Sequence, residues 1–139
     1  MITWDDLEVN TSLPPIEYLV DEAMMNAYRN AVRNLGALYP TIAGRHPTRA
    51  FYAEYGLHLR APNMGYRSWY VNPPRVGIRV RVRSHIVGKF VKRDLRFVIV
   101  ESICNDQDNL LIEISRLTGL VSAAGGPALA AVARKGGHQ

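Results

Sequence analysis

Polar and apolar residues alternate with two different periods along this chain of 139 residues. Between residues 21 and 36 alanine recurs every four positions, which predicts an amphipathic helix that begins at Asp21 and ends at Gly36. A second apolar stripe predicts a helix from Thr48 to His58, with the Thr48 side chain as its cap. This second helix is apolar enough to be the one around which the domain folds.

After Gly65 the period changes to two, and four β-rich stretches follow one another. They cover residues 66–71, 78–90, 95–104 and 110–121. The turns between them are short enough for antiparallel neighbours, and residues 1–19 are expected to form an extended lead-in. Helices followed by a block of strands predict an α+β domain in which an antiparallel sheet packs on one helix.

Three arginines, Arg79, Arg81 and Arg83, alternate with aliphatic residues in the second of these stretches. That alternation predicts a strand with one buried face and one face in water. Aromatic residues, which would stack on bases, do not interleave with the arginines, so we expect no binding of nucleic acid. Residues 97–100 are apolar at every position, which predicts a strand inside the sheet or beneath a partner.

The composition is that of a globular protein, with 47% hydrophobic and 21% charged residues. No run approaches the roughly 18 apolar residues of a membrane span, and the first residues lack the pattern of a signal peptide. We therefore expect a cytoplasmic protein. The single cysteine, Cys104, lies in an apolar run and is expected to be a buried, inert thiol.

The formal net charge is +5, and only three of the 17 basic residues are lysines. The guanidinium group holds phosphate through a planar fork, so the excess of arginine favours an anionic partner such as coenzyme A or another phosphate ester. An arginine bias in the coding sequence explains the same composition equally well.

Four stretches resemble the MaoC-like hotdog dehydratases and enoyl-CoA hydratases, above all their non-catalytic, N-terminal FAS1-like half. The stretches are residues 3–32, GRHPTRAF at 44–51, residues 73–102, and NDQDNLLIEISRLT at 105–118. The resemblance implies a single hotdog domain over residues 1–122, with an antiparallel sheet wrapped around the central helix, and a small-residue-rich tail over 123–139. Departures from the family pattern are Ile78, Asp94, Leu95 and Asn109.

The resemblance also implies work on acyl thioesters of coenzyme A or acyl carrier protein, without a cofactor. Active members hydrate a trans-2-enoyl thioester, or dehydrate a 3-hydroxyacyl one, with the Asp and His of a D-x-N-P-x-H motif. One of these side chains activates water while the other delivers a proton. In this chain the residue five positions before each histidine is Thr41, Ala53, Val80 or Ala133, so the dyad is missing.

We therefore expect a non-catalytic, pocket-forming subunit, with the dyad supplied by a second MaoC-like chain in a hetero-oligomer. A homodimeric protein that binds acyl thioesters without turnover is the alternative from another class. A third reading is a homodimeric thioesterase or hydratase that uses Glu54 with His46. No spacing of histidines indicates a metal site.

Six residues are the candidate substrate contacts: His46, Asn63, Met64, Lys92, Arg93 and Arg96. His46 precedes the central helix, where it either contacts the thioester or packs as a capping histidine. Asn63 and Met64 are placed by the family fold at the mouth of the acyl pocket. The three basic residues either hold coenzyme A phosphates or form an ordinary charged turn.

Overall fold

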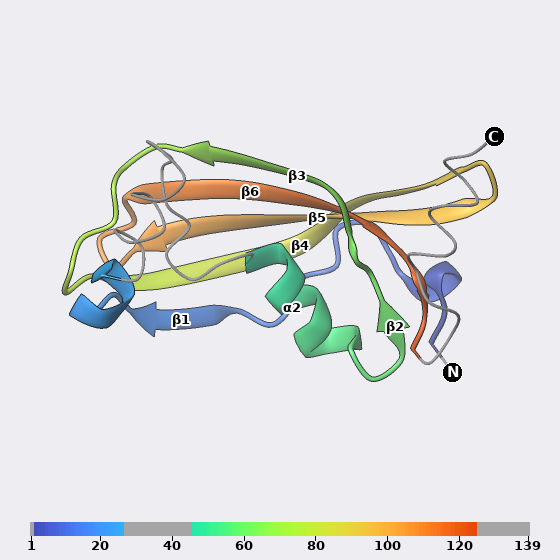
Figure 1. Cartoon of the computed structure of the whole chain (residues 1–139), viewed down its shortest axis with the longest axis horizontal. Helices are drawn as coiled ribbons and strands as arrows, with labels where there is room; N and C mark the ends of the chain where they lie inside the picture. The colour runs from blue at the N-terminus through green and yellow to red at the C-terminus, as the bar shows by residue number, and fades with distance from the viewer. Residues whose placement is uncertain (1, 27–45, 125–139) are drawn as a thin grey trace.

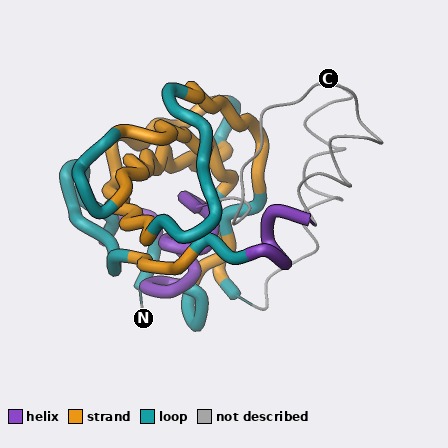
Figure 2. The backbone as a smooth tube through the Cα atoms, turned by 90° about the vertical axis from the view of Figure 1, so that its left-hand side faces the viewer, coloured by secondary structure: helices purple, strands orange, loops and turns teal. Residues whose placement is uncertain are grey.

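A computed structural model of the chain describes residues 2–26 and 46–124 (Figure 1). Its elements are η1 (Trp4–Asp6), β1 (Ile16–Leu19), α2 (His46–Tyr55), β2 (Leu59–Arg60), β3 (Asn63–Tyr70), β4 (Arg79–Lys92), β5 (Leu95–Asp106), β6 (Leu111–Leu120) and β7 (Ser122–Ala123). Five strands form one antiparallel sheet in the order β1-β4-β5-β6-β3, and β2 pairs with β7. The sheet curves around α2 (Figure 2), which confirms the α+β prediction.

The long hairpin of β4 and β5 turns through two residues, Arg93 and Asp94. Both have positive φ angles, 53° and 63°, which is the backbone of a type I′ turn and matches the twist of the two strands. Lys92 and Leu95 are directly paired across it, so the predicted turn between these strands is confirmed.

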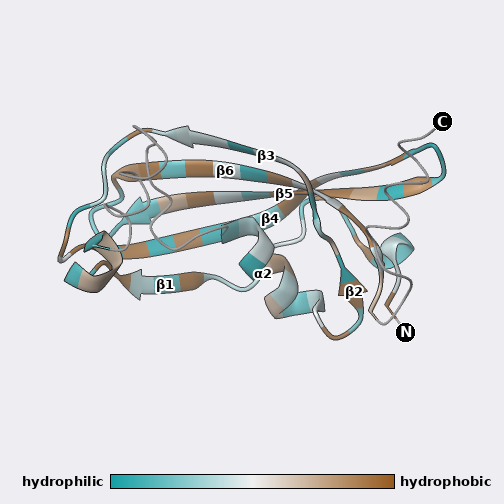
Figure 3. Cartoon of the chain, viewed as in Figure 1, coloured by the Kyte–Doolittle hydropathy of each residue, from teal (hydrophilic) through white to brown (hydrophobic). Residues whose placement is uncertain are grey.

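Apolar and polar residues alternate along the strands, and the apolar ones form the core on the concave face of the sheet. Bands of hydrophobic and hydrophilic residues alternate along β4 (Figure 3), where Val80 and Val82 are buried and the arginines between them are exposed. Phe51 of α2 is fully buried against this face, in a cluster that includes Val98 and Val100 of β5. Because β5 lies between β4 and β6, its apolar run is inside the sheet, as predicted.

The central helix lies close to its predicted place but differs at both ends. Thr48 is within α2, so the prediction that it caps the helix is wrong, and Pro47 occupies the first turn, where a proline is tolerated. The helix ends at Tyr55 rather than at His58. A Cβ on Gly56 would lie 2.5 Å from the Tyr52 carbonyl oxygen, so the tight exit from the helix requires glycine.

The first predicted helix begins where expected. The Met24 backbone N–H donates to Asp21 Oδ1 at 2.8 Å, and residues 22–26 are helical. Its remainder, 27–36, lies outside the described residues, and so does the expected tail apart from residues 123 and 124.

The N-terminal lead-in is part of the sheet edge, and the prediction of a merely extended segment was incomplete. Besides β1, residues 10–13 exchange backbone hydrogen bonds with β4, where Leu13 N–H donates to the Ser84 carbonyl at 2.9 Å. Leu7 and Leu13 are buried in the core. Residues 10–13 and β1 therefore form one edge of the sheet along β4.

Candidate functional site

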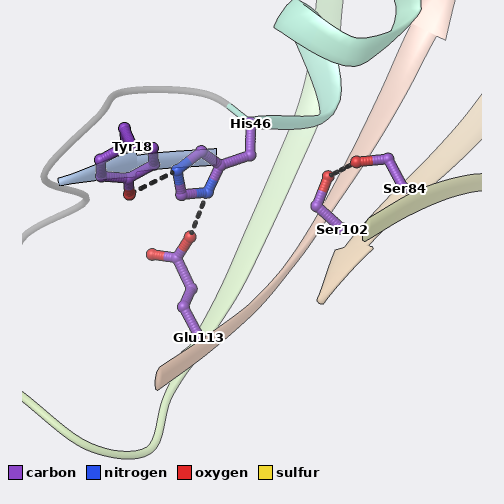
Figure 4. Close-up of polar contacts among 5 residues, drawn as sticks. All are labelled: Tyr18, His46, Ser84, Ser102 and Glu113. Atoms are coloured by element: carbon purple, nitrogen blue, oxygen red, sulfur yellow. Dashed lines mark hydrogen bonds and ion pairs between the residues drawn. The ribbon is translucent and has the colours of Figure 1, made fainter. Parts of the chain in front are cut away.

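The centre of the concave face holds a histidine whose two ring nitrogens both have partners. His46 Nδ1 lies 3.2 Å from Glu113 Oε1, and His46 Nε2 lies 3.0 Å from the Tyr18 hydroxyl (Figure 4). The three side chains come from α2, β6 and β1. Only 2% of the surface of His46 and of Glu113 is exposed, so solvent competes little for these hydrogen bonds.

The register of the sheet explains why these residues meet. Glu113 pairs with Cys104 on β5, Cys104 pairs with Val82 on β4, and Tyr18 pairs with Val80 one row away. All these side chains point to the face that α2 covers. A carboxylate buried there requires hydrogen-bond donors, and the imidazole at the start of α2 supplies one.

Burial and charge shift the proton affinities of two neighbours of this histidine. Burial raises the pKa of Tyr18, and electrostatic interaction with Cys104 and Glu113 raises it further. Burial, with the Glu113 charge as a second cause, raises the pKa of the Cys104 thiol to about 12. Both groups are therefore protonated at neutral pH, and Cys104 is the buried thiol that the sequence predicts.

A row of serines crosses the sheet beside this cluster. Ser84, Ser102, Ser115 and Ser68 occupy successive paired positions on β4, β5, β6 and β3. The Ser84 and Ser102 hydroxyls lie 2.6 Å apart and are buried (Figure 4). The concave face therefore has a polar row of serines next to the row that holds Glu113, in contrast to the aliphatic rows nearer the β4–β5 hairpin.

The three side chains form a chain of two hydrogen bonds. With Nδ1–H donating to Glu113 Oε1, Nε2 accepts a hydrogen bond from the Tyr18 hydroxyl, so the two partners fix the tautomer and the orientation of the ring. Among residues 2–26 and 46–124, no group of three or more histidine, cysteine, aspartate or glutamate side chains is placed to hold a metal ion. Within the same residues, no helix is long and apolar enough to cross a membrane.

His46 is the one predicted site residue that lies in this cluster. The predicted pairing of His46 with Glu54 is wrong. Glu54 is exposed on α2, and the carboxylate that contacts His46 Nδ1 is that of Glu113. Whether a thioester reaches His46 stays a prediction.

Asn63 and Met64 lie at the beginning of β3, which starts three residues earlier than predicted. Tyr70, at the other end of β3, is the residue that pairs with Glu113. Tyr70 lies seven positions along the strand from Asn63, a distance of about 23 Å. Met64 is 50% exposed at a bulge in the pairing, so neither residue joins the His46 cluster.

The three basic residues lie at the β4–β5 hairpin and do not form one group. Lys92 and Arg96 point to opposite faces of the hairpin, since Arg96 pairs with Val91. The Arg96 guanidinium packs over the Trp4 ring at 5.7 Å. Lys92 is ten residues along β4 from Val82, about 33 Å from the row of Glu113, so phosphate binding by these residues stays a prediction remote from His46.

Sequence reasoning missed Glu113 and Tyr18, which complete the cluster. The available signal was Glu113 itself, a carboxylate between Ile112 and Ile114 in a predicted strand. A charge in such a run is either on a wet face or paired in the core. Nothing in the local pattern decides between these alternatives, because the partner is 67 residues away.

Comparison with known proteins finds similarity in structure but not in sequence. No protein-family model matches the chain, and no curated protein matches it either. The MaoC-like dehydratase from Rhodospirillum rubrum is similar in structure, with a TM-score of 0.61 and 16% identity over 88% of this chain and 97% of that one.

Two further solved structures show the same likeness. The C-terminally truncated HadBC (3R-hydroxyacyl-ACP dehydratase) complex from Mycobacterium tuberculosis has a TM-score of 0.59 and 13% identity, covering 82% of this chain and 96% of that one. A hypothetical thioesterase from Streptococcus pneumoniae, solved with coenzyme A, has a TM-score of 0.58 and 9% identity, covering 84% and 83%. This chain has the hotdog fold of the MaoC-like dehydratases.

Proposed function

We propose that this chain is the non-catalytic subunit of a hetero-oligomeric hydratase or dehydratase of acyl thioesters. In this assembly a second MaoC-like chain supplies the Asp and His that handle water and protons. The chain described here supplies part of the sheet and one wall of the acyl pocket. Its substrate is a thioester of coenzyme A or acyl carrier protein.

The closed environment of His46 is the observation that carries the proposal. A hydratase needs an acid and a base that face the substrate. Here both ring nitrogens are engaged by Glu113 and Tyr18, and the ring is 2% exposed. The sequence adds that Thr41, five residues earlier, stands where the family motif has its aspartate.

The edge strand β3 supports a partner chain. It is an outer strand of the sheet, and Trp69, Tyr70 and the adjoining Val71 are 42%, 37% and 52% exposed. An edge with large exposed side chains favours pairing with another strand. The similar HadBC structure is a complex of 3R-hydroxyacyl-ACP dehydratase, which makes assembly with another chain of this fold a natural expectation.

Co-expression with a MaoC-like chain encoded beside it tests the proposal. We expect a stable complex that hydrates crotonyl-coenzyme A, while this chain alone gives no hydration above the uncatalysed rate. The matched control replaces the Asp and His of the partner and is expected to abolish activity with the complex intact. A homodimer that ignores its neighbour contradicts the proposal.

A second candidate is a thioesterase or hydratase that acts alone through the Tyr18–His46–Glu113 cluster. The oriented imidazole favours it, because a histidine that acts as a base is held in place by a third group at its second ring nitrogen, as Glu113 holds His46. This candidate predicts turnover of an acyl thioester by the isolated chain and loss of that turnover in His46→Gln. Activity that survives this substitution, or no activity of the wild type, excludes it.

A further inference from the structure

The convex face of the sheet carries two adjoining hollows that the thioester proposal does not use. The first encloses about 500 Å³ between residues 12–15 and β4, and the second about 380 Å³ along the start of β4 and the end of β5. Both are lined by Glu17, Arg81 and Arg83, so they form one groove across the sheet edge. The first hollow falls within the usual size range of small-molecule sites.

Two prolines open this groove. Ser12 pairs with His85 and Ile16 pairs with Val82, so the three residues 13–15 span only two residues of β4. Pro14 and Pro15 have no N–H to donate to the strand, which forces the chain to arch away from β4 beside Arg83. The hollow is therefore a consequence of the sequence.

The charges in the groove are mostly positive. Arg79, Arg81 and Arg83 line it, and His85 joins them at the first hollow. Only Arg81 has a carboxylate partner among the described residues, Glu17 Oε1 at 2.9 Å.

One more carboxylate, Asp106, lines the second hollow, but it is turned inward. Its Oδ1 accepts the backbone N–H groups of Asp108 and Leu110 at 2.8 and 2.9 Å. Two guanidinium groups, those of Arg79 and Arg83, therefore remain in the groove without a carboxylate among the described residues.

We infer that this groove binds a phosphate-bearing small molecule through the guanidinium groups of Arg79, Arg81 and Arg83. Alternate residues of a strand are about 6.6 Å apart, so two adjacent guanidinium forks reach one phosphate or diphosphate from the same side. Ser12 and the amide of Gln107 offer further hydrogen bonds, and Ile103 provides an apolar floor.

The groove recognises phosphate and not a nucleobase. His85 is the only aromatic ring among the described lining residues, so the groove offers no tryptophan, tyrosine or phenylalanine on which a base would stack. Pyrophosphate and ADP are therefore expected to bind with similar affinity, whereas adenosine is not expected to bind. Equal affinity supports a phosphate ester as the ligand, whereas tight binding of pyrophosphate with weak binding of ADP would contradict this expectation and point to free phosphate.

Isothermal titration of the whole chain at low ionic strength tests this inference. Wild type is expected to bind pyrophosphate with a Kd below about 1 mM, and Arg83→Gln to weaken binding about tenfold or more. Arg67→Gln is the matched control. It removes one exposed arginine from the same face at β3, outside the groove, and is expected to leave Kd unchanged.

Glu17→Gln gives a test in the opposite direction. It removes the carboxylate from the groove and releases Arg81, so pyrophosphate binding is expected to tighten several-fold. Thermal unfolding of each variant confirms that it is folded. The inference is overturned if wild type does not bind pyrophosphate, if adenosine binds as well as ADP, or if Arg67→Gln weakens binding as much as Arg83→Gln.

Discussion

His46 Nδ1 and Glu113 Oε1 lie 3.2 Å apart in the core, joining the start of α2 to β6 across 67 residues of sequence. A buried polar pair of this kind stabilises a fold only while both members are present, since either one alone is left without its hydrogen bond. The pair therefore anchors the central helix in its sheet, whatever further chemistry it performs.

Glu113→Ala is expected to lower the free energy of unfolding by about 2–3 kcal/mol, because it leaves the His46 ring nitrogen buried without its acceptor. Urea denaturation measures the change. Glu54→Ala, which removes an exposed carboxylate from α2, is the control and is expected to stay within about 0.5 kcal/mol of wild type. Equal effects of the two substitutions would show that the buried pair contributes nothing.

The two serines at the centre of the sheet permit a double-mutant cycle. Ser84→Ala or Ser102→Ala leaves one buried hydroxyl unpaired and is expected to cost about 1–2 kcal/mol. The double variant removes both hydroxyls, so its loss is expected to be smaller than the sum of the two single losses. Urea unfolding of all four proteins measures the coupling, and strict additivity would argue against the hydrogen bond.

Alkaline pH is expected to destabilise the fold through Cys104. Burial raises the pKa of this thiol from 9.0 to about 12, so the folded protein keeps a proton that the unfolded chain releases. The resulting stability is fully present below about pH 9 and is lost as pH rises toward 12. Tyr18, whose pKa is also raised, acts in the same direction above pH 10.

Cys104→Ala isolates the contribution of the thiol. The free energy of unfolding of wild type should fall with pH above 9 more steeply than that of the variant, by up to about 1.4 kcal/mol per pH unit. Urea unfolding at several pH values measures both slopes. Parallel slopes for the two proteins would rule out Cys104 as the titrating group.

The turn of the β4–β5 hairpin can be changed to stabilise the fold. Arg93 and Asp94 both adopt left-handed backbone angles, which asparagine and glycine tolerate better. The double substitution Arg93→Asn with Asp94→Gly is expected to raise the free energy of unfolding by about 1 kcal/mol, because it relieves the cost of left-handed backbone angles at two ordinary residues. Lys92→Asn, in the extended backbone of β4, is the control and is expected to give no gain. Thermal unfolding compares them.

Local pattern predicted much of this fold because strand periodicity is a local property. The predicted stretches 78–90 and 95–104 correspond to β4 and β5, with β4 beginning one residue later than predicted, and the exposed face of the arginines is confirmed. The two edge strands of the sheet were harder to predict. β1 and the start of β3 have weak patterns of their own, because their pairing with β4 and β6 determines them.

The site was predictable only in part. His46 stands out as a histidine before an apolar helix, whereas Glu113 becomes meaningful only once the register places it beside Cys104 and beneath the ring. The carboxylate that contacts His46 comes from β6, 67 residues along the chain, so it lies outside any motif within a few residues of the histidine.

The outer margin of β3 has a consequence for handling the protein. Among residues 2–26 and 46–124 no strand pairs with the outer side of β3, which carries Trp69 and Tyr70, while the opposite edge strand is short and followed by charged residues. Produced without a companion, the polypeptide would be driven to satisfy that side with copies of itself. The protein produced alone should therefore form larger oligomers as its concentration rises.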